Sequence, residues 1–156
     1  MFKTHLALGF LIALFSLSIL HPAYPFIFIP LVTILSALPD VDTEKSKFGR
    51  KIYPISWCIR IVFGHRGFFH SIFPPVILYF VLKYFHLQFL GLAVVIGYVA
   101  HLIGDACTSE GVAFLYPFSK KRISGFMRTG GFAESFVLVA LILVDIYISL
   151  KKVNLL

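Results

Sequence analysis

Hydrophobic residues are distributed along this chain in five long runs, which short polar segments separate. The runs cover residues 5–20, 23–39, 68–85, 88–108 and 132–150. Each run is close to the roughly 20 residues that an α-helix needs to cross the hydrocarbon core of a bilayer. The pattern therefore predicts an all-α protein, a polytopic membrane helical bundle of about five spans. The length suits a single membrane-embedded domain over residues 1–156.

The first two runs are joined by the turn-like segment HPAYP at 21–25. This short connection predicts a tight helical hairpin, and a partly re-entrant pair is the alternative. Because no small-residue cleavage site follows the first run, we expect it to be a mature helix rather than a signal peptide.

The composition agrees with a membrane protein. Hydrophobic residues make up 59% of the chain and charged residues 13%, whereas soluble domains have about half and about a quarter. The net charge of +7 comes from short basic blocks between apolar runs, which are typical of topology signals, so no nucleic-acid partner is expected. Cys58 and Cys107 are too few for a disulfide framework and fit free thiols in a reducing compartment.

The basic residues predict the orientation, because loops on the cytoplasmic side retain Lys and Arg. Lys3 lies near the N-terminus, and the others lie between the second and third runs and between the fourth and fifth runs. These are Lys45, Lys47, Arg50, Lys51, Arg60, Arg66, Lys120, Lys121, Arg122 and Arg128. The N-terminus and both loops are therefore predicted to lie on the cytoplasmic side of the inner (plasma) membrane. Five spans then place Lys151 and Lys152 outside, as a mild exception.

Ionisable residues gather at one predicted membrane face, at the cytoplasmic ends of the helices. They are His5, Asp40, Asp42, His65, Arg66, His70, His101, Asp105 and Glu134. A charged or imidazole side chain inside a span costs a few kcal/mol or more unless it is paired or solvated. His101 and Asp105, four residues apart, share one helix face. Because imidazole and carboxylate are ligands that zinc accepts, the pattern predicts a metal site.

Each of these residues also has a simpler interpretation. A lone His5 or His65 at a helix end is typically a capping or interfacial residue, and Asp40 could simply start a turn. The pair His101 and Asp105 could be a buried hydrogen-bonded pair that tightens the bundle. These interpretations do not account for the shared location.

Three stretches carry a resemblance to a known family: LPDVDTEKSKFG, FGHRGFFHS and GYVAHLIGDACTSEGV. In this order and spacing, over roughly residues 1–135, they resemble the membrane-bound metal-dependent hydrolase family, one bacterial member of which is a LexA-regulated inner-membrane protein. A more distant similarity is to zinc-dependent phospholipase C and P1-type nucleases, which are all-helical phosphodiesterases. That similarity implies metal ligands at His5, Asp40, His70, His101, Asp105 and Glu134. Two histidines of the distant pattern are absent, since Glu110, Gly111 and Gly130 stand in their neighbourhoods.

The resemblance implies a metal-dependent hydrolase that cleaves a phosphoester of a phospholipid or another amphiphilic substrate by a metal-activated water. One or two divalent ions are expected, zinc before manganese. In the implied mechanism Asp40 is a ligand and a candidate base, and Asp42 orients a ligand His or acts as the general base. Arg66 or His65 holds a phosphate oxygen, and Thr108 hydrogen-bonds the substrate or a ligand carboxylate. One alternative is a non-catalytic regulatory or scaffold protein with a structural metal site. An ion or proton carrier that uses Asp145 ranks last.

Overall fold

The protein, as a computed structural model, is described for residues 1–42 and 67–153, and the regular elements of this part are helices. Its elements are α1 (Phe2–Leu20), α2 (Pro25–Leu35), η1 (Pro39–Asp42), η2 (Phe68–His70), α5 (Phe73–Tyr84), α6 (Gln88–Ala106) and α7 (Phe132–Val153), where η denotes a 3₁₀ helix. These residues form no strand, only two isolated β-bridges between α6 and α7. The prediction of an all-α protein is confirmed for the described residues.

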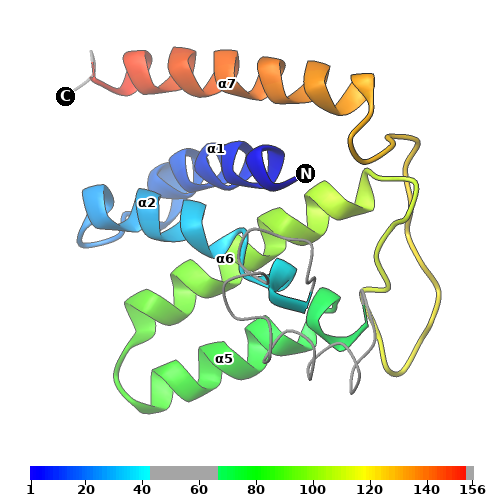
Figure 1. The fold of residues 1–156 in the computed structure, drawn as a ribbon. Helices are drawn as coiled ribbons and strands as arrows, with labels where there is room; N and C mark the ends of the chain where they lie inside the picture. The colour runs from blue at the N-terminus through cyan, green and yellow to red at the C-terminus, as the bar shows by residue number, and fades with distance from the viewer. Residues whose placement is uncertain (43–66, 154–156) are drawn as a thin grey trace.

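Three of the helices form the centre of the molecule, and two lie on its flanks. Helices α1, α2 and α6 each pack against the other two, while α5 packs against α6 and α7 packs against α1. Figure 1 shows α5 and α7 on opposite sides of this central group. A cluster of fully buried side chains from the three central helices, Ala13, Phe28, Val32 and Ala93, fills the interior. The core is therefore built mainly by the first half of the chain together with α6.

The five predicted runs all contain a helix, but two of these helices are shorter than predicted. Among the described residues, α1, α6 and α7 are long and apolar enough to cross a membrane. Helices α2 and α5 have 11 and 12 residues, which corresponds to about 16–18 Å at 1.5 Å per residue, against a core of about 30 Å. Three of the predicted spans therefore contain a helix long enough to cross a membrane, and a total of about five spans stays a prediction.

Prolines explain where α2 ends and where α5 begins. Pro39 cannot donate the backbone hydrogen bond that would continue α2, and it disfavours a helical conformation at Leu38. Helix α5 has Pro74 and Pro75 in its first turn, the part of a helix where proline is tolerated. The chain before it therefore forms the separate 3₁₀ helix η2 instead of extending α5 back to residue 68.

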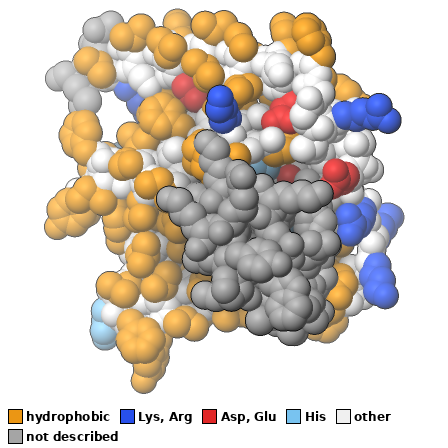
Figure 2. Space-filling view, viewed as in Figure 1, with side chains coloured by type: hydrophobic (Ala, Val, Ile, Leu, Met, Phe, Trp, Pro, Cys, Tyr) orange, Lys and Arg blue, Asp and Glu red, His pale blue; other side chains and the backbone are white. Residues whose placement is uncertain are grey.

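The surface of the bundle is strongly apolar. Figure 2 shows hydrophobic side chains over most of the described face, and exposed large side chains such as Phe26, Phe80 and Leu143 come from α2, α5 and α7. A soluble monomer rarely exposes so much contiguous apolar surface. This surface is the one expected of helices that face lipid.

Candidate metal centre

Five of the predicted ligand residues meet at one end of the bundle. His5 comes from the first turns of α1, Asp40 from η1, His70 from η2, and His101 and Asp105 from the last turns of α6. The side chains of His5, His70, His101 and Asp105 are almost completely enclosed, with 0 or 1% of each residue exposed. Residues far apart in the sequence therefore form one buried polar cluster, called the His/Asp cluster below.

Within this cluster the side chains fall into two groups that share His101. One group is His5, His101 and Asp105, and the other is Asp40, His70 and His101. In each group the three potential ligand atoms lie within 4.8 Å of one another. Such spacing allows the atoms of a group to approach a single ion.

A backbone contact fixes the orientation of the shared histidine. Nδ1 of His101 lies 2.8 Å from the carbonyl oxygen of Ser36, and because a carbonyl can only accept, Nδ1 carries the proton. The lone pair is then on Nε2, which points at the cluster and lies 3.3 Å from Nε2 of His70. Metal-binding histidines are typically held in this way by a carbonyl or carboxylate behind the ring.

Asp105 is the acidic residue at the centre of the group of imidazoles. Its carboxylate oxygens lie 3.3 Å from Nε2 of His5, 3.5 Å from Nε2 of His70 and 3.6 Å from Nε2 of His101. The rings of His5 and His101 stack, with centroids 4.0 Å apart. The distances to the imidazoles are longer than those of good hydrogen bonds. The polar atoms therefore lie near one another without forming strong hydrogen bonds.

The surroundings of His5 fit a bound cation. Both ring nitrogens of His5 are buried, and with the described residues Nδ1 forms no hydrogen bond while Nε2 has only the 3.3 Å contact with Asp105. Such groups are costly in a protein interior unless something binds them. Gly104 leaves the space that the ring occupies, since a Cβ at that position would lie 2.8 Å from Nδ1 of His5. The residues present therefore suit a divalent metal with nitrogen and oxygen ligands.

Glu134 lies outside both groups, although it was predicted as a ligand. One of its oxygens accepts a hydrogen bond from the Thr4 hydroxyl at 2.8 Å and contacts the Met1 ammonium at 2.6 Å. The other oxygen accepts from the backbone N–H of Gly130 at 2.6 Å. In this structure Glu134 joins the start of α7 to the start of α1.

Thr108, predicted to contact substrate, is fully buried behind the cluster. Its hydroxyl donates to the backbone carbonyl of Asp105 at 2.7 Å and accepts from the N–H of Gly111. These contacts end α6 and support the backbone that carries Asp105. A direct role in substrate binding stays a prediction. So do the roles of His65 and Arg66, which lie outside the described residues, and of Asp42, whose side chain is not described.

Two residues that support the cluster, Ser36 and Tyr98, were not predicted from the sequence. Ser36 provides the carbonyl behind His101, and its hydroxyl donates to the backbone carbonyl of His5 at 2.9 Å. The hydroxyl of Tyr98 donates to the carbonyl of Phe69 at 2.6 Å and so holds η2, which carries His70. The signal in the sequence was Ser36 itself, a polar residue within the otherwise apolar run ILSALPD.

The fold and the cluster together define an all-helical membrane protein with buried His and Asp side chains at one end of its bundle. The chain belongs to the YdjM inner membrane protein family, whose profile matches residues 1–154. This membership agrees with the predicted localisation in an inner membrane.

Two curated relatives are similar over much of the chain. The "Uncharacterized protein YvsG" of Bacillus subtilis is 37% identical over 112 residues, which cover 70% of each chain. The "Inner membrane protein YdjM" of Escherichia coli is 36% identical over 95 residues, which cover 57% of this chain and 48% of that protein. No solved structure matches.

Proposed function

We propose that this protein is a metal-dependent hydrolase of the inner membrane that cleaves a phosphoester of a phospholipid or another amphiphilic substrate. The observation that carries the proposal is the pair of ligand groups, enclosed except for Asp40, that share His101. The resemblance of the three motifs to membrane-bound metal-dependent hydrolases supports the reaction type. The proposal includes one or two divalent ions as cofactors.

The donor set favours zinc, with manganese as the alternative. Three imidazoles and two carboxylates are available in the two groups. Imidazole nitrogens suit zinc, whereas manganese prefers sites richer in oxygen. Zinc bound here would lower the pKa of a coordinated water toward neutrality and offset charge on a phosphoryl oxygen.

The residues of the chain then have distinct tasks. Ser36 holds the proton on Nδ1 of His101, so that Nε2 remains available as a ligand. Asp105 compensates the positive charge of the site from inside the bundle. Asp40 is only partly buried, unlike His70 and His101 of the same group. We therefore assign the approach of substrate to the side of the cluster formed by η1.

The proposed site lies on the cytoplasmic side. Described basic residues at the end of the bundle that holds the cluster are Lys3, Lys120, Lys121, Arg122 and Arg128, against Lys83, Lys151 and Lys152 at the opposite end. The excess of positive charge at the first end supports this orientation.

One observation favours a second candidate function, a structural metal site in a regulatory or scaffold protein. At most 1% of His5, His101 and Asp105 is exposed. Structural zinc sites are typically closed to solvent, whereas catalytic sites keep an open position. The group that contains Asp40 is the less enclosed of the two and is the one expected to react.

The experiment that tests the proposal measures metal by elemental analysis of the detergent-purified protein, followed by hydrolysis assays on the same samples. The wild type is compared with His101→Ala and with the control His86→Ala, a histidine in the turn between α5 and α6. We expect bound zinc in the wild type and in the control, and at least about a tenfold loss of affinity in His101→Ala. Turnover of bis(4-nitrophenyl) phosphate or a phospholipid should follow the metal.

The possible results separate the two functions. Metal that is lost in His101→Ala, with no hydrolysis of any phosphoester by the wild type, favours the structural site. Equal metal content in all three proteins contradicts both functions. The variant Arg66→Ala sharpens the distinction, because it should keep the metal and reduce turnover only if the protein is a hydrolase.

A further inference from the structure

We infer that the connection between α6 and α7, residues 107–131 and called the α6–α7 loop here, lies on the membrane surface and binds the head groups of anionic lipids. This surface is separate from the His/Asp cluster, and the inference holds whether or not the protein is a hydrolase. It rests on the charge, the exposed aromatic side chains, the ordered backbone and the location of the loop.

The loop carries a clear excess of positive charge. It contains four basic residues, Lys120, Lys121, Arg122 and Arg128, and one acidic residue, Glu110. All four basic residues are exposed, and none forms an ion pair with a described residue. Arg122 donates one hydrogen bond, to the backbone carbonyl of Glu110 at 3.2 Å. The charges are therefore available to an anionic partner.

Large apolar side chains project from the same loop. Phe118 is 84% exposed and Phe126 is 92% exposed, and Leu115 and Ile123 are more than half exposed. Lipid contact with the sides of spanning helices does not account for these residues, because they lie outside the helices. Exposed phenylalanines beside exposed Lys and Arg are typical of segments that lie in the interface of a membrane, with the rings among the acyl chains and the cations at the phosphates.

The backbone of the loop is ordered rather than extended into solvent. Val112 and Ile123 exchange two backbone hydrogen bonds of 2.9 Å each, and a bridge pairs Thr108 with Met127. Gly125 lies so close to the carbonyl of Cys107 that no Cβ would fit there. Such a backbone presents the basic and aromatic side chains from fixed positions, so less entropy is lost when they bind.

The location of the loop matches the depth of a membrane surface. It follows Asp105 by two residues and ends three residues before Glu134, so it covers the end of the bundle that holds the His/Asp cluster. The N–H of Ile72 donates to the carbonyl of Phe114 at 3.0 Å, and the ring of Phe118 packs against Phe73 at the start of α5. Figure 1 shows the loop at the ends of α6 and α7, and Figure 2 shows Lys and Arg side chains gathered on that side.

Anionic lipid accounts for the charge and the apolar surface together. An acidic soluble protein would satisfy the cations but would leave the phenylalanines to be covered separately. The cytoplasmic leaflet carries negative surface charge and attracts basic segments next to a spanning helix. Phosphatidylglycerol, with an anionic phosphate beside acyl chains, provides both contacts.

A tryptophan placed in the loop tests its location. Trp57 is the natural tryptophan of the chain, so the reporter is Phe126→Trp in the Trp57→Phe protein, reconstituted in nanodiscs. We expect strong quenching by lipids with a nitroxide near the head group and weak quenching by acrylamide in the water. Phe136→Trp, on the exposed side of α7, is the control for a side chain in contact with lipid.

A charge variant tests the lipid class. Nanodiscs with phosphatidylcholine and phosphatidylglycerol are compared by native mass spectrometry of the lipids that remain bound to the released protein. The variant Lys120→Gln/Lys121→Gln/Arg122→Gln should lose most of the preference for phosphatidylglycerol, by several-fold. The matched control Lys151→Gln/Lys152→Gln, at the opposite end of the bundle, should keep it.

Two results would overturn the inference. Strong quenching of the loop tryptophan by acrylamide, without quenching by the head-group nitroxide, would show that the loop faces water and leave an acidic soluble protein as its partner. A preference for phosphatidylglycerol that is the same in the wild type and in the triple variant would show that anionic lipid binds elsewhere.

Discussion

Helices α6 and α7 are both long and apolar enough to cross a membrane, yet they are buried to very different extents. In its most apolar stretch 56% of α6 is buried inside the protein, compared with 11% of α7. Helix α6 packs against three helices, whereas α7 packs against α1 and otherwise exposes its side chains. Hydrophobicity alone therefore does not distinguish a helix of the protein interior from one that is mainly exposed on the surface of the protein.

Small residues distinguish the buried helix α6 from the exposed helix α7. Helix α6 contains Gly91, Gly97 and Gly104, and at Gly97 an added Cβ would lie 2.8 Å from the backbone carbonyl of Val32 in α2. Without a hydrophobic driving force between helices in lipid, close backbone contact of this kind is what holds them together. Helix α7 has no glycine and carries bulky side chains along its length. The more closely packed helix also contributes two residues of the His/Asp cluster, His101 and Asp105.

Among the variants that test the difference between α6 and α7, Gly104→Ala is expected to have the largest effect, a loss of metal affinity. The added methyl would meet the ring of His5, with Nδ1 at 2.8 Å and Cε1 at 3.1 Å, so one ligand group must open. We expect a loss of metal affinity of about 10–100-fold, as for other residues that support a ligand. Elemental analysis after dialysis against graded chelator concentrations measures this loss.

The control for this variant is Gly91→Ala, the same change in the same helix. Its added Cβ would meet the Tyr79 ring at 3.2 Å, at the contact between α5 and α6 and away from the cluster. Metal binding should be unchanged there. If both variants lose metal equally, the packing of α6 as a whole controls the site, and not the space beside His5.

The sequence predicted where the helices lie, though not all of their lengths, and which ionisable residues come together. Runs of apolar residues predicted a helix in each of the five places, because a lipid environment leaves few alternatives to a helix for such segments. His5, Asp40, His70, His101 and Asp105 were predicted as ligands and are brought together by the fold. The shared position at the helix ends was the signal, since ionisable residues are costly in spans.

What the sequence did not reveal depends on the backbone between the helices. The carbonyl of Ser36 reaches His101 because α2 ends at Leu35, and hydrophobicity does not determine that end. The pattern also placed Glu134 at the correct end of the bundle but could not tell a ligand from a contact between helices. Such distinctions require side-chain positions a few ångströms apart.

Glu134→Gln is expected to affect stability without affecting the metal. The change removes the negative charge that accepts hydrogen bonds from Thr4 and Gly130 at the start of α7, where an acidic residue also favours the helix. A loss of about 2 kcal/mol in the free energy of unfolding is expected for a hydrogen bond to a charged group. Denaturation in detergent measures it, and the zinc content should equal that of the wild type.

A variant at the other end of the same contact provides the comparison. Thr4→Val removes one hydrogen bond but leaves the carboxylate of Glu134 charged, so a smaller loss of stability is expected. If Glu134→Gln instead releases zinc, Glu134 is a ligand in the metal-bound protein, and α7 belongs to the site after all.

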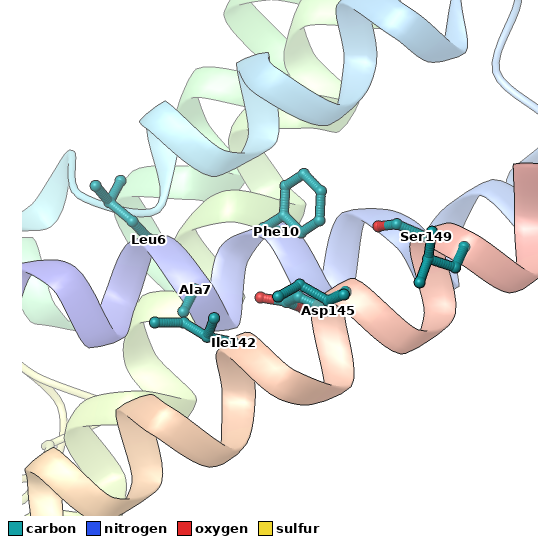
Figure 3. Close-up of a pocket in the computed structure, with 8 residues that line it drawn as sticks. Leu6, Ala7, Phe10, Ile142, Asp145 and Ser149 are labelled. Atoms are coloured by element: carbon teal, nitrogen blue, oxygen red, sulfur yellow. The ribbon is translucent and has the colours of Figure 1, made fainter.

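The smallest effect is expected from Asp145→Leu, in the groove between α1 and α7. The groove has a volume of about 470 Å³, and Asp145 lines it together with Leu6, Ala7 and Phe10 of α1 (Figure 3). Asp145 is 8% exposed, and its Oδ1 has no hydrogen-bond partner among the described residues. Because a buried polar group without a partner costs free energy, leucine should raise the free energy of unfolding by about 1 kcal/mol. Thermal denaturation in detergent measures the gain, and the metal content should not change.

Asp145→Asn separates the two contributions to this gain. It keeps the size and the need for hydrogen bonds while it removes the charge, so it should give less stabilisation than leucine. A destabilised Asp145→Leu protein would mean that the carboxyl binds a partner in the membrane. In that event a polar contact along α7 would add to the Glu134–Thr4 contact at its start, and the contrast between α6 and α7 would be one of location rather than of chemistry.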